Sequence, residues 1–84
     1  MRIFASIINQ KINSITAEEL LRYAKIFKIS ITGAQAAQIA KYLRGRQVNI
    51  FDDRERAILV KEIARTAGVE TAREVNRLFL ELMK

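Results

Sequence analysis

The sequence predicts an all-α fold: a compact bundle of four to five short helices with short, partly extended apolar connections. Three observations lead to this prediction: capping signals recur along the chain, apolar residues recur every three or four positions, and proline is absent. Hydrophobic residues make up 50% of the 84 residues, more than a disordered basic tail would carry. We therefore expect a single helical domain over residues 1–84.

The first predicted helix spans residues 2–11 and has the weakest pattern of the five. Its apolar residues, with one just beyond its end, are Ile3, Phe4, Ile7, Ile8 and Ile12. Arg2 and Lys11 flank this apolar face. Such a face suits either the core of a bundle or an interfacial anchor on a membrane surface. Because so small a domain needs apolar surface for its core, we expect this helix to pack inside the bundle.

Capping signals mark the starts of the other four helices. Each signal places a hydroxyl or carboxylate at the cap position and a Glu or Gln three residues later. The four signals begin at Thr16, Thr32, Asp52 and Thr71. Gly45 and Gly68 follow periodic apolar runs and indicate two helix ends. The predicted helices span residues 17–28, 33–44, 53–67 and 72–83.

Each of these four helices carries an apolar stripe with the spacing i, i+3, i+4, i+7, which is typical of a helix that buries one face. The stripes consist of Leu20, Tyr23, Ala24 and Phe27, of Ala36, Ile39, Ala40 and Leu43, of Leu59, Val60, Ile63, Ala64 and Ala67 flanked by Ile58, and of Val75, Leu78, Phe79 and Leu82. We expect these residues to form the core.

Apolar residues also occur outside the stripes. Residues 29–31 and 48–51 alternate briefly between apolar and polar side chains, which predicts buried extended links between helices. Ile26, Leu80 and Met83 lie off the stripes of their helices. Isolated exposed apolar residues are ordinary, but together these three also suit a dimer or partner surface.

The net charge of +6 is confined to the first part of the chain. Residues 1–51 hold eight Lys or Arg and two acids, whereas residues 52–84 hold seven of each sign. Six cations fall outside the apolar stripes of the second and third predicted helices or just beyond their ends: Arg22, Lys25, Lys28, Lys41, Arg44 and Arg46. If these helices lie side by side, the six form one basic face that suits phosphate contacts. The alternative is a solvated surface, because cations also favour helix C-termini.

The sequence does not favour sequence-specific DNA recognition. Gln35 and Gln38 are the candidates for contacts with base edges, but Gln35 already has a place in a capping signal. The aromatic residues fall mostly on the core stripes, and Tyr42 is the one candidate for an exposed ring that could stack on a base.

The composition argues against catalysis and against cofactors. Without Cys or His, the chain lacks thiol chemistry, the usual zinc ligands and the common neutral-pH acid–base residue. The acids Asp52, Asp53 and Glu55 lack the spacing of a calcium loop, and their place at a helix N-terminus explains them. We expect no enzyme activity, no cofactor and no metal site. The apolar runs are too short for a membrane span or a signal peptide, so we expect a cytoplasmic protein.

Several segments resemble a known family. They are residues 11–16 leading into Glu19, residues 43–45, residues 48–51 with Arg56, residues 61–64, and residues 71–76 up to Phe79. These segments are similar to a family of short uncharacterised proteins, a domain of unknown function, from Bacillus and related bacteria. The resemblance implies a cytoplasmic bacterial protein and supplies no activity, ligand or site residue.

The sequence therefore predicts a non-enzymatic binding domain. One hypothesis is that its basic face binds nucleic acid or another polyanion. The alternative is a protein-interaction or regulatory adaptor that acts as a homo-oligomer, with a homodimer as the simplest form, or that turns the basic face toward an acidic protein partner.

Overall fold

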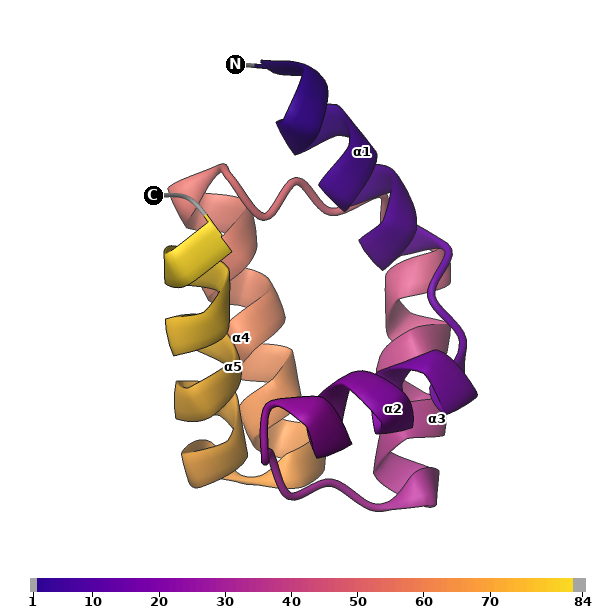
Figure 1. The fold of residues 1–84 in the computed structure, drawn as a ribbon. Coiled ribbons are helices and arrows are strands. Elements are labelled where there is room, and N and C mark those ends of the chain that lie inside the picture. Colours follow the sequence, from indigo (N-terminus) through magenta and orange to yellow (C-terminus); the bar gives the residue numbers. More distant parts are fainter. Residues whose placement is uncertain (1, 83–84) are drawn as a thin grey trace.

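The computed structural model of the chain describes residues 2–82, with side chains for residues 5–81. It contains five helices, α1 (Arg2–Asn13), α2 (Ala17–Ile26), α3 (Gly33–Arg44), α4 (Asp53–Ala67) and α5 (Val69–Leu82) (Figure 1). No strand occurs between residues 2 and 82, so the predicted all-α fold is confirmed. The predicted apolar contributions of Ile3, Phe4, Leu82 and Met83, and the flanking charge of Arg2, lie outside the described side chains.

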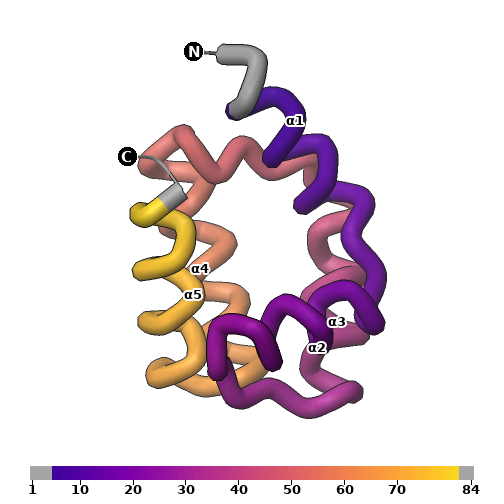
Figure 2. The backbone as a smooth tube through the Cα atoms, viewed as in Figure 1, coloured from indigo at the N-terminus to yellow at the C-terminus, as the bar shows by residue number. Residues whose placement is uncertain are grey.

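The helices follow one another around an incomplete ring. α2 packs on α3, α3 packs on both α1 and α4, and α4 packs on α5 in an antiparallel hairpin. Among the residues described, no other pair of helices has its backbones in contact, so α5 faces α1 and α2 across the interior (Figure 2). This open arrangement positions the candidate site described below.

The core lies on the inner sides of α3 and α4. All four predicted positions of α3, namely Ala36, Ile39, Ala40 and Leu43, are buried, as are Leu59 and Ile63 of α4. Ile50, from the link between these helices, is fully buried, and Val48 is buried two residues before it with the exposed Asn49 between them. The alternation predicted for residues 48–51 is therefore present. In the other link, Ile29 and Ile31 are only half-buried.

Two predicted core residues of α2 are exposed instead. Tyr23 retains 41% of its accessible surface and Phe27 retains 50%. The reason is architectural: among the described helices, α2 has its backbone in contact with α3 alone, so no second helix covers this side of it. Ile7 of α1 and Ile58 of α4 are also exposed, at 58% and 55%. Ile8 and Ile12 of α1 do pack against the core, as expected.

Two predicted helix starts have complete capping boxes. The Thr16 hydroxyl accepts a hydrogen bond from the Glu19 N–H (3.1 Å), and the Glu19 carboxylate accepts one from the Thr16 N–H (3.0 Å). Thr32 and Gln35 form the same reciprocal pair. Gln35 is thus engaged in capping, as its position in the sequence suggests.

The third start is capped only in part, and the fourth prediction is wrong. Asp52 accepts from the Glu55 N–H (3.0 Å), but the Glu55 carboxylate binds the Asn49 N–H (2.8 Å) rather than returning to the cap. Thr71 is not a cap, because α5 begins at Val69 and Thr71 is buried inside it. Its hydroxyl donates to the Ser30 carbonyl (2.9 Å).

Two helix boundaries differ from the prediction, the start of α5 and the end of α2, and both have backbone causes. Gly68, with φ of 100° and ψ of 157°, is the single residue between α4 and α5, so the chain turns there and becomes helical again at once. α2 ends at Ile26 rather than residue 28, because Lys28 adopts the left-handed conformation with φ of 59°. The Ile29 N–H then bonds back to the Ala24 carbonyl (2.7 Å) and closes the helix end.

Candidate interaction site

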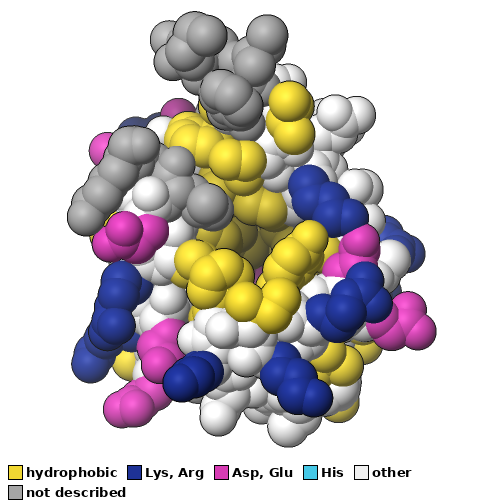
Figure 3. Space-filling view, in the orientation of Figure 1, with side chains coloured by type: hydrophobic (Ala, Val, Ile, Leu, Met, Phe, Trp, Pro, Cys, Tyr) yellow, Lys and Arg dark blue, Asp and Glu magenta, His cyan; other side chains and the backbone are white. Residues whose placement is uncertain are grey.

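An apolar cavity of about 430 Å³ lies inside the ring of helices. Ile39 and Leu43 of α3 and Leu59 and Ile63 of α4 line it. α1, α2 and α5 add further apolar side chains, among them Ile12, Leu20, Ala24, Val75 and Leu78. The cavity opens on the face shown in Figure 3, where hydrophobic side chains surround a hollow. It exists because the stripes of α2 and α5 both turn inward but stand too far apart to meet.

Exposed apolar side chains surround the opening. Ile7, Tyr23 and Phe27 line the cavity and retain 41–58% of their accessible surface. Ile26, which is next to Phe27 and one turn from Tyr23 on α2, is 67% exposed, as predicted. We call these four side chains the mouth residues. Exposed apolar side chains around a hollow mark a candidate binding site.

An ion pair borders the opening between α1 and α2. Lys11, which lines the cavity, donates a hydrogen bond to the Glu19 carboxylate. This bond, with a smaller contribution from the Thr16 N–H, lowers the pKa of Glu19 below its ordinary value. The same bond raises the pKa of Lys11. The pair is charged at neutral pH and joins α2 to the end of α1.

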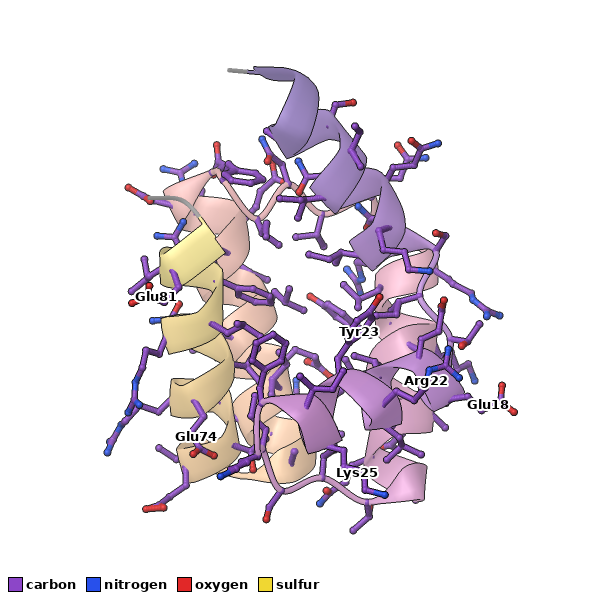
Figure 4. All side chains as sticks on the ribbon, in the orientation of Figure 1. Glu18, Arg22, Tyr23, Lys25, Glu74 and Glu81 are labelled. Atoms are coloured by element: carbon purple, nitrogen blue, oxygen red, sulfur yellow. The ribbon has the colours of Figure 1, made fainter. Side chains whose placement is uncertain are left out.

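Charged side chains border both sides of the opening. Arg22 and Lys25 of α2 lie on the face with the opening, and Glu74 and Glu81 of α5 lie on the other side (Figure 4). The two acids are one helical turn before and after Leu78, which lines the cavity. Each side also holds exposed charges of the other sign, namely Glu18 on α2 and Arg73 and Arg77 on α5.

The six cations of the predicted basic face are all exposed. None forms an ion pair with any side chain among residues 5–81, whereas Lys11, Arg56 and Arg65 do. Arg46 is positioned over the Tyr42 ring, 4.6 Å from its centroid. Tyr42 is half-buried against the core, so its predicted role as a free stacking ring is not supported by its position.

The six cations do not gather at one point. Arg22 and Lys25 lie beside the opening, and Lys28 follows the C-terminal end of α2. Arg44 is the last residue of α3 and Arg46 lies two residues beyond it, at the end of α3 that is farther from the C-terminal end of α2 (Figure 1). α3 alone is about 18 Å long at 1.5 Å per residue, and Lys41 is one turn from its end. Polyanion binding through all six stays a prediction.

Two asparagines that the sequence analysis overlooked support the wall of the opening. Asn13 of α1 accepts from the Val48 N–H (2.7 Å) and donates to the Val48 carbonyl (2.8 Å). Asn9, one turn earlier, accepts from the Ile50 N–H (3.0 Å). The available signal was a pair of asparagines four residues apart in the first predicted helix and just beyond it, because such a pair shares one helix face.

The described part of the chain has neither a metal-type cluster of side chains nor a helix that could span a membrane. Within residues 5–81, no three acidic side chains converge as metal ligands would. The acids at the start of α4 have separate partners: Asp52 caps the helix, Asp53 pairs with Arg56 (2.6 Å) and Glu55 binds the Asn49 N–H. Of the five helices described, none has the length and apolar character needed to cross a bilayer.

Comparison with known proteins places the chain in a family. Residues 1–83 match the family model described as "Protein of unknown function (DUF2624)". The chain is 44% identical over 79 residues to the uncharacterised protein YqfT of Bacillus subtilis (strain 168), and the alignment covers 94% of each chain. No solved structure matches it. The resemblance carried by the capping and link segments is thereby confirmed: the chain belongs to the DUF2624 family.

Proposed function

We propose that this protein is a small, non-enzymatic interaction module of the bacterial cytoplasm, and that the mouth of its cavity is the contact surface for another protein. The observation that carries the proposal is the open apolar cavity together with the exposed mouth residues. Apart from Lys11 and the Tyr23 hydroxyl, the lining offers only aliphatic and aromatic groups, which supports binding rather than catalysis.

The mouth residues leave apolar surface in contact with water. Fully burying a side chain such as Phe, Ile or Leu contributes about 1.5–3 kcal/mol, and each mouth residue still exposes about half of its surface. A partner that covers these residues and fills the hollow recovers that contribution. The charged residues around the opening then set its orientation, since electrostatic complementarity mainly determines specificity.

A photo-crosslinker at the mouth tests this proposal. Ile26→p-benzoylphenylalanine places the reactive group beside the opening without removing a cavity-lining residue, and irradiation is performed in the bacterium that makes the protein. We expect a discrete covalent adduct, whose members mass spectrometry identifies. The matched control is Ile58→p-benzoylphenylalanine on α4, an isoleucine of similar exposure (55%) that lies on another helix and lines no cavity in the described part of the chain. Absence of an adduct at position 26, or equal adducts at both positions, would refute the proposal.

Polyanion binding is the second candidate function, and the six exposed cations without ion pairs support it. Fluorescence anisotropy against random duplex DNA and single-stranded RNA at about 50 and 200 mM salt tests it, because binding through several phosphates weakens steeply over that range. We expect the double variant Lys25→Glu with Arg44→Glu to lose most of the binding while its circular dichroism stays helical. Salt-insensitive binding, or no binding at low salt, would exclude this function.

A further inference from the structure

We infer that the partner at the mouth is a second copy of this chain, in a two-fold symmetric dimer that sets α2 of each copy against α5 of the other. The inference rests on the proposed function and names its partner. Three features support it: the self-complementary shape of the opening, the opposite charges of Arg22 and Glu74 on its two edges, and the size of the face.

One face of the molecule carries both a hollow and bulky apolar side chains. In a two-fold dimer the same patch serves both subunits, so each residue of one copy meets a different residue of the other. A face with only a hollow, or only protruding side chains, could not pair with itself in this way. Here the cavity lies beside Ile26 and Phe27, which are 67% and 50% exposed, so each copy offers side chains that can enter its partner's hollow.

The charges beside the opening favour one relative orientation of the two copies. Two copies that meet face to face can be related by an axis in the plane of the interface, running between α2 and α5. Rotation by 180° about this axis places the α5 edge of one copy over the α2 edge of the other. Glu74 then approaches the edge that carries Arg22 and Lys25 (Figure 4). The contact brings acids to cations twice, once on each side of the axis.

Neighbouring charges leave this match intact. Glu19 lies on the α2 side of the opening, but Lys11 is bound to it. Arg77 is the nearest cation on α5, and it lies about 100° around the helix from Leu78, whereas Glu74 is only about 40° away. Arg22 is one turn before the mouth residue Ile26. The match is therefore carried by Glu74 and Arg22, while the exposed Arg77 on α5 and Glu18, one turn before Arg22 on α2, share the two edges with them.

The face is large enough for a stable dimer. Standard protein interfaces bury about 800 Å² per partner, which is about one eighth of the 6047 Å² accessible surface of this chain. The molecule measures 33 × 23 × 21 Å, so its broadest face projects about 760 Å², and a standard interface would use nearly all of that face. The hollow at its centre adds depth to the contact.

A charge-swap experiment tests the inference. Sedimentation velocity of the wild type, up to about 1 mM protein, is expected to give a species of twice the 9.6 kDa chain mass. Arg22→Glu and Glu74→Arg, each placing like charges together at two symmetric sites, should each weaken the dimer about tenfold or more. Combining the two substitutions should restore it. Lys61→Glu makes the same change in net charge as Arg22→Glu, but away from the opening, and should leave the dimer unchanged.

Disulfide trapping gives an independent readout, because the natural chain contains no cysteine. Mixing the single variants Arg22→Cys and Glu74→Cys under mild oxidation should give a mixed disulfide dimer faster than either variant alone. A monomer at all concentrations, no rescue in the double variant, or no preference for the mixed disulfide would overturn the inference. If the photo-crosslinker at position 26 still captures a different protein, the proposed function survives that failure. If it captures nothing, both fail.

Discussion

At the scale of single residues, the side chain of Asn13 joins α1 to the link between α3 and α4. It forms hydrogen bonds with both backbone groups of Val48, in a link that has no neighbouring strand to satisfy them. Val48 is buried, so its N–H and carbonyl need partners from the protein. The same side chain also binds the Asn9 carbonyl (2.8 Å). Asn13 thereby fixes α1, one wall of the cavity, to the core.

We expect Asn13→Ala to lower the free energy of unfolding by about 2–3 kcal/mol, because it removes these bonds and leaves buried backbone groups without partners. Urea denaturation followed by circular dichroism measures the change. Gln10→Ala alters an exposed residue of the same helix and should change stability by less than about 0.5 kcal/mol. Equal effects of the two substitutions would contradict the role given to Asn13.

The Lys11–Glu19 pair makes stability depend on pH. The pKa of Glu19 is lower in the folded protein than its ordinary value of 4.5, chiefly because of the bond from Lys11. The stabilisation is therefore present above pH 4.5 and is lost as the pH falls through the lowered value. We expect Glu19→Gln to remove this part of the acid sensitivity. Denaturation midpoints as a function of pH test it, with the exposed Glu18→Gln as a control that keeps the wild-type profile.

At the scale of elements, the junction between α4 and α5 depends on one residue. The backbone conformation of Gly68, with φ of 100° and ψ of 157°, is essentially restricted to glycine. Gly45, at the end of α3, has φ of −95° and ψ of 0°, which other residues adopt readily. A Cβ atom at either position would meet no other atom within 4 Å. The two glycines thus differ only in backbone conformation.

This contrast gives a matched pair of substitutions. Gly68→Ala should lower the free energy of unfolding by about 1–3 kcal/mol through backbone strain alone. Gly45→Ala should be neutral or slightly stabilising, because alanine reduces the conformational freedom of the unfolded chain. Thermal or urea denaturation compares them directly. A similar cost at both positions would mean that the turn at Gly68 is not what links the two helices.

Local patterns predicted most of the elements, for local reasons. The boxes at Thr16 and Thr32 depend only on residues within one turn, and both formed as predicted. The start of α5 was misplaced because Thr71 and Glu74 have the spacing of a cap, while the decisive residue, Gly68, lies three positions earlier. The end of α2 was misplaced because Lys28 adopts a left-handed conformation that lysine rarely adopts.

At the scale of the whole molecule, periodicity identifies which side of a helix is apolar but not whether two apolar sides meet. The inward stripe of α3 is covered because α2, α4 and α1 all pack on that helix. Tyr23 and Phe27 have the same spacing as core residues and remain exposed because the ring is open beside them. The cavity is a property of the tertiary arrangement, so no local pattern could reveal it. The same applies to the six cations, whose distribution depends on how α2 crosses α3.

The central claim is that the mouth residues are covered in the working protein, and hydroxyl-radical footprinting tests this directly. Tyr23 and Phe27 should be oxidised slowly at high protein concentration and faster on dilution, as the dimer separates. Ile58 of α4 is 55% exposed and does not line the cavity, so its oxidation rate should stay constant and serves as an internal reference. Rates at Tyr23 and Phe27 that stay high and independent of concentration would contradict coverage of the mouth by a second copy.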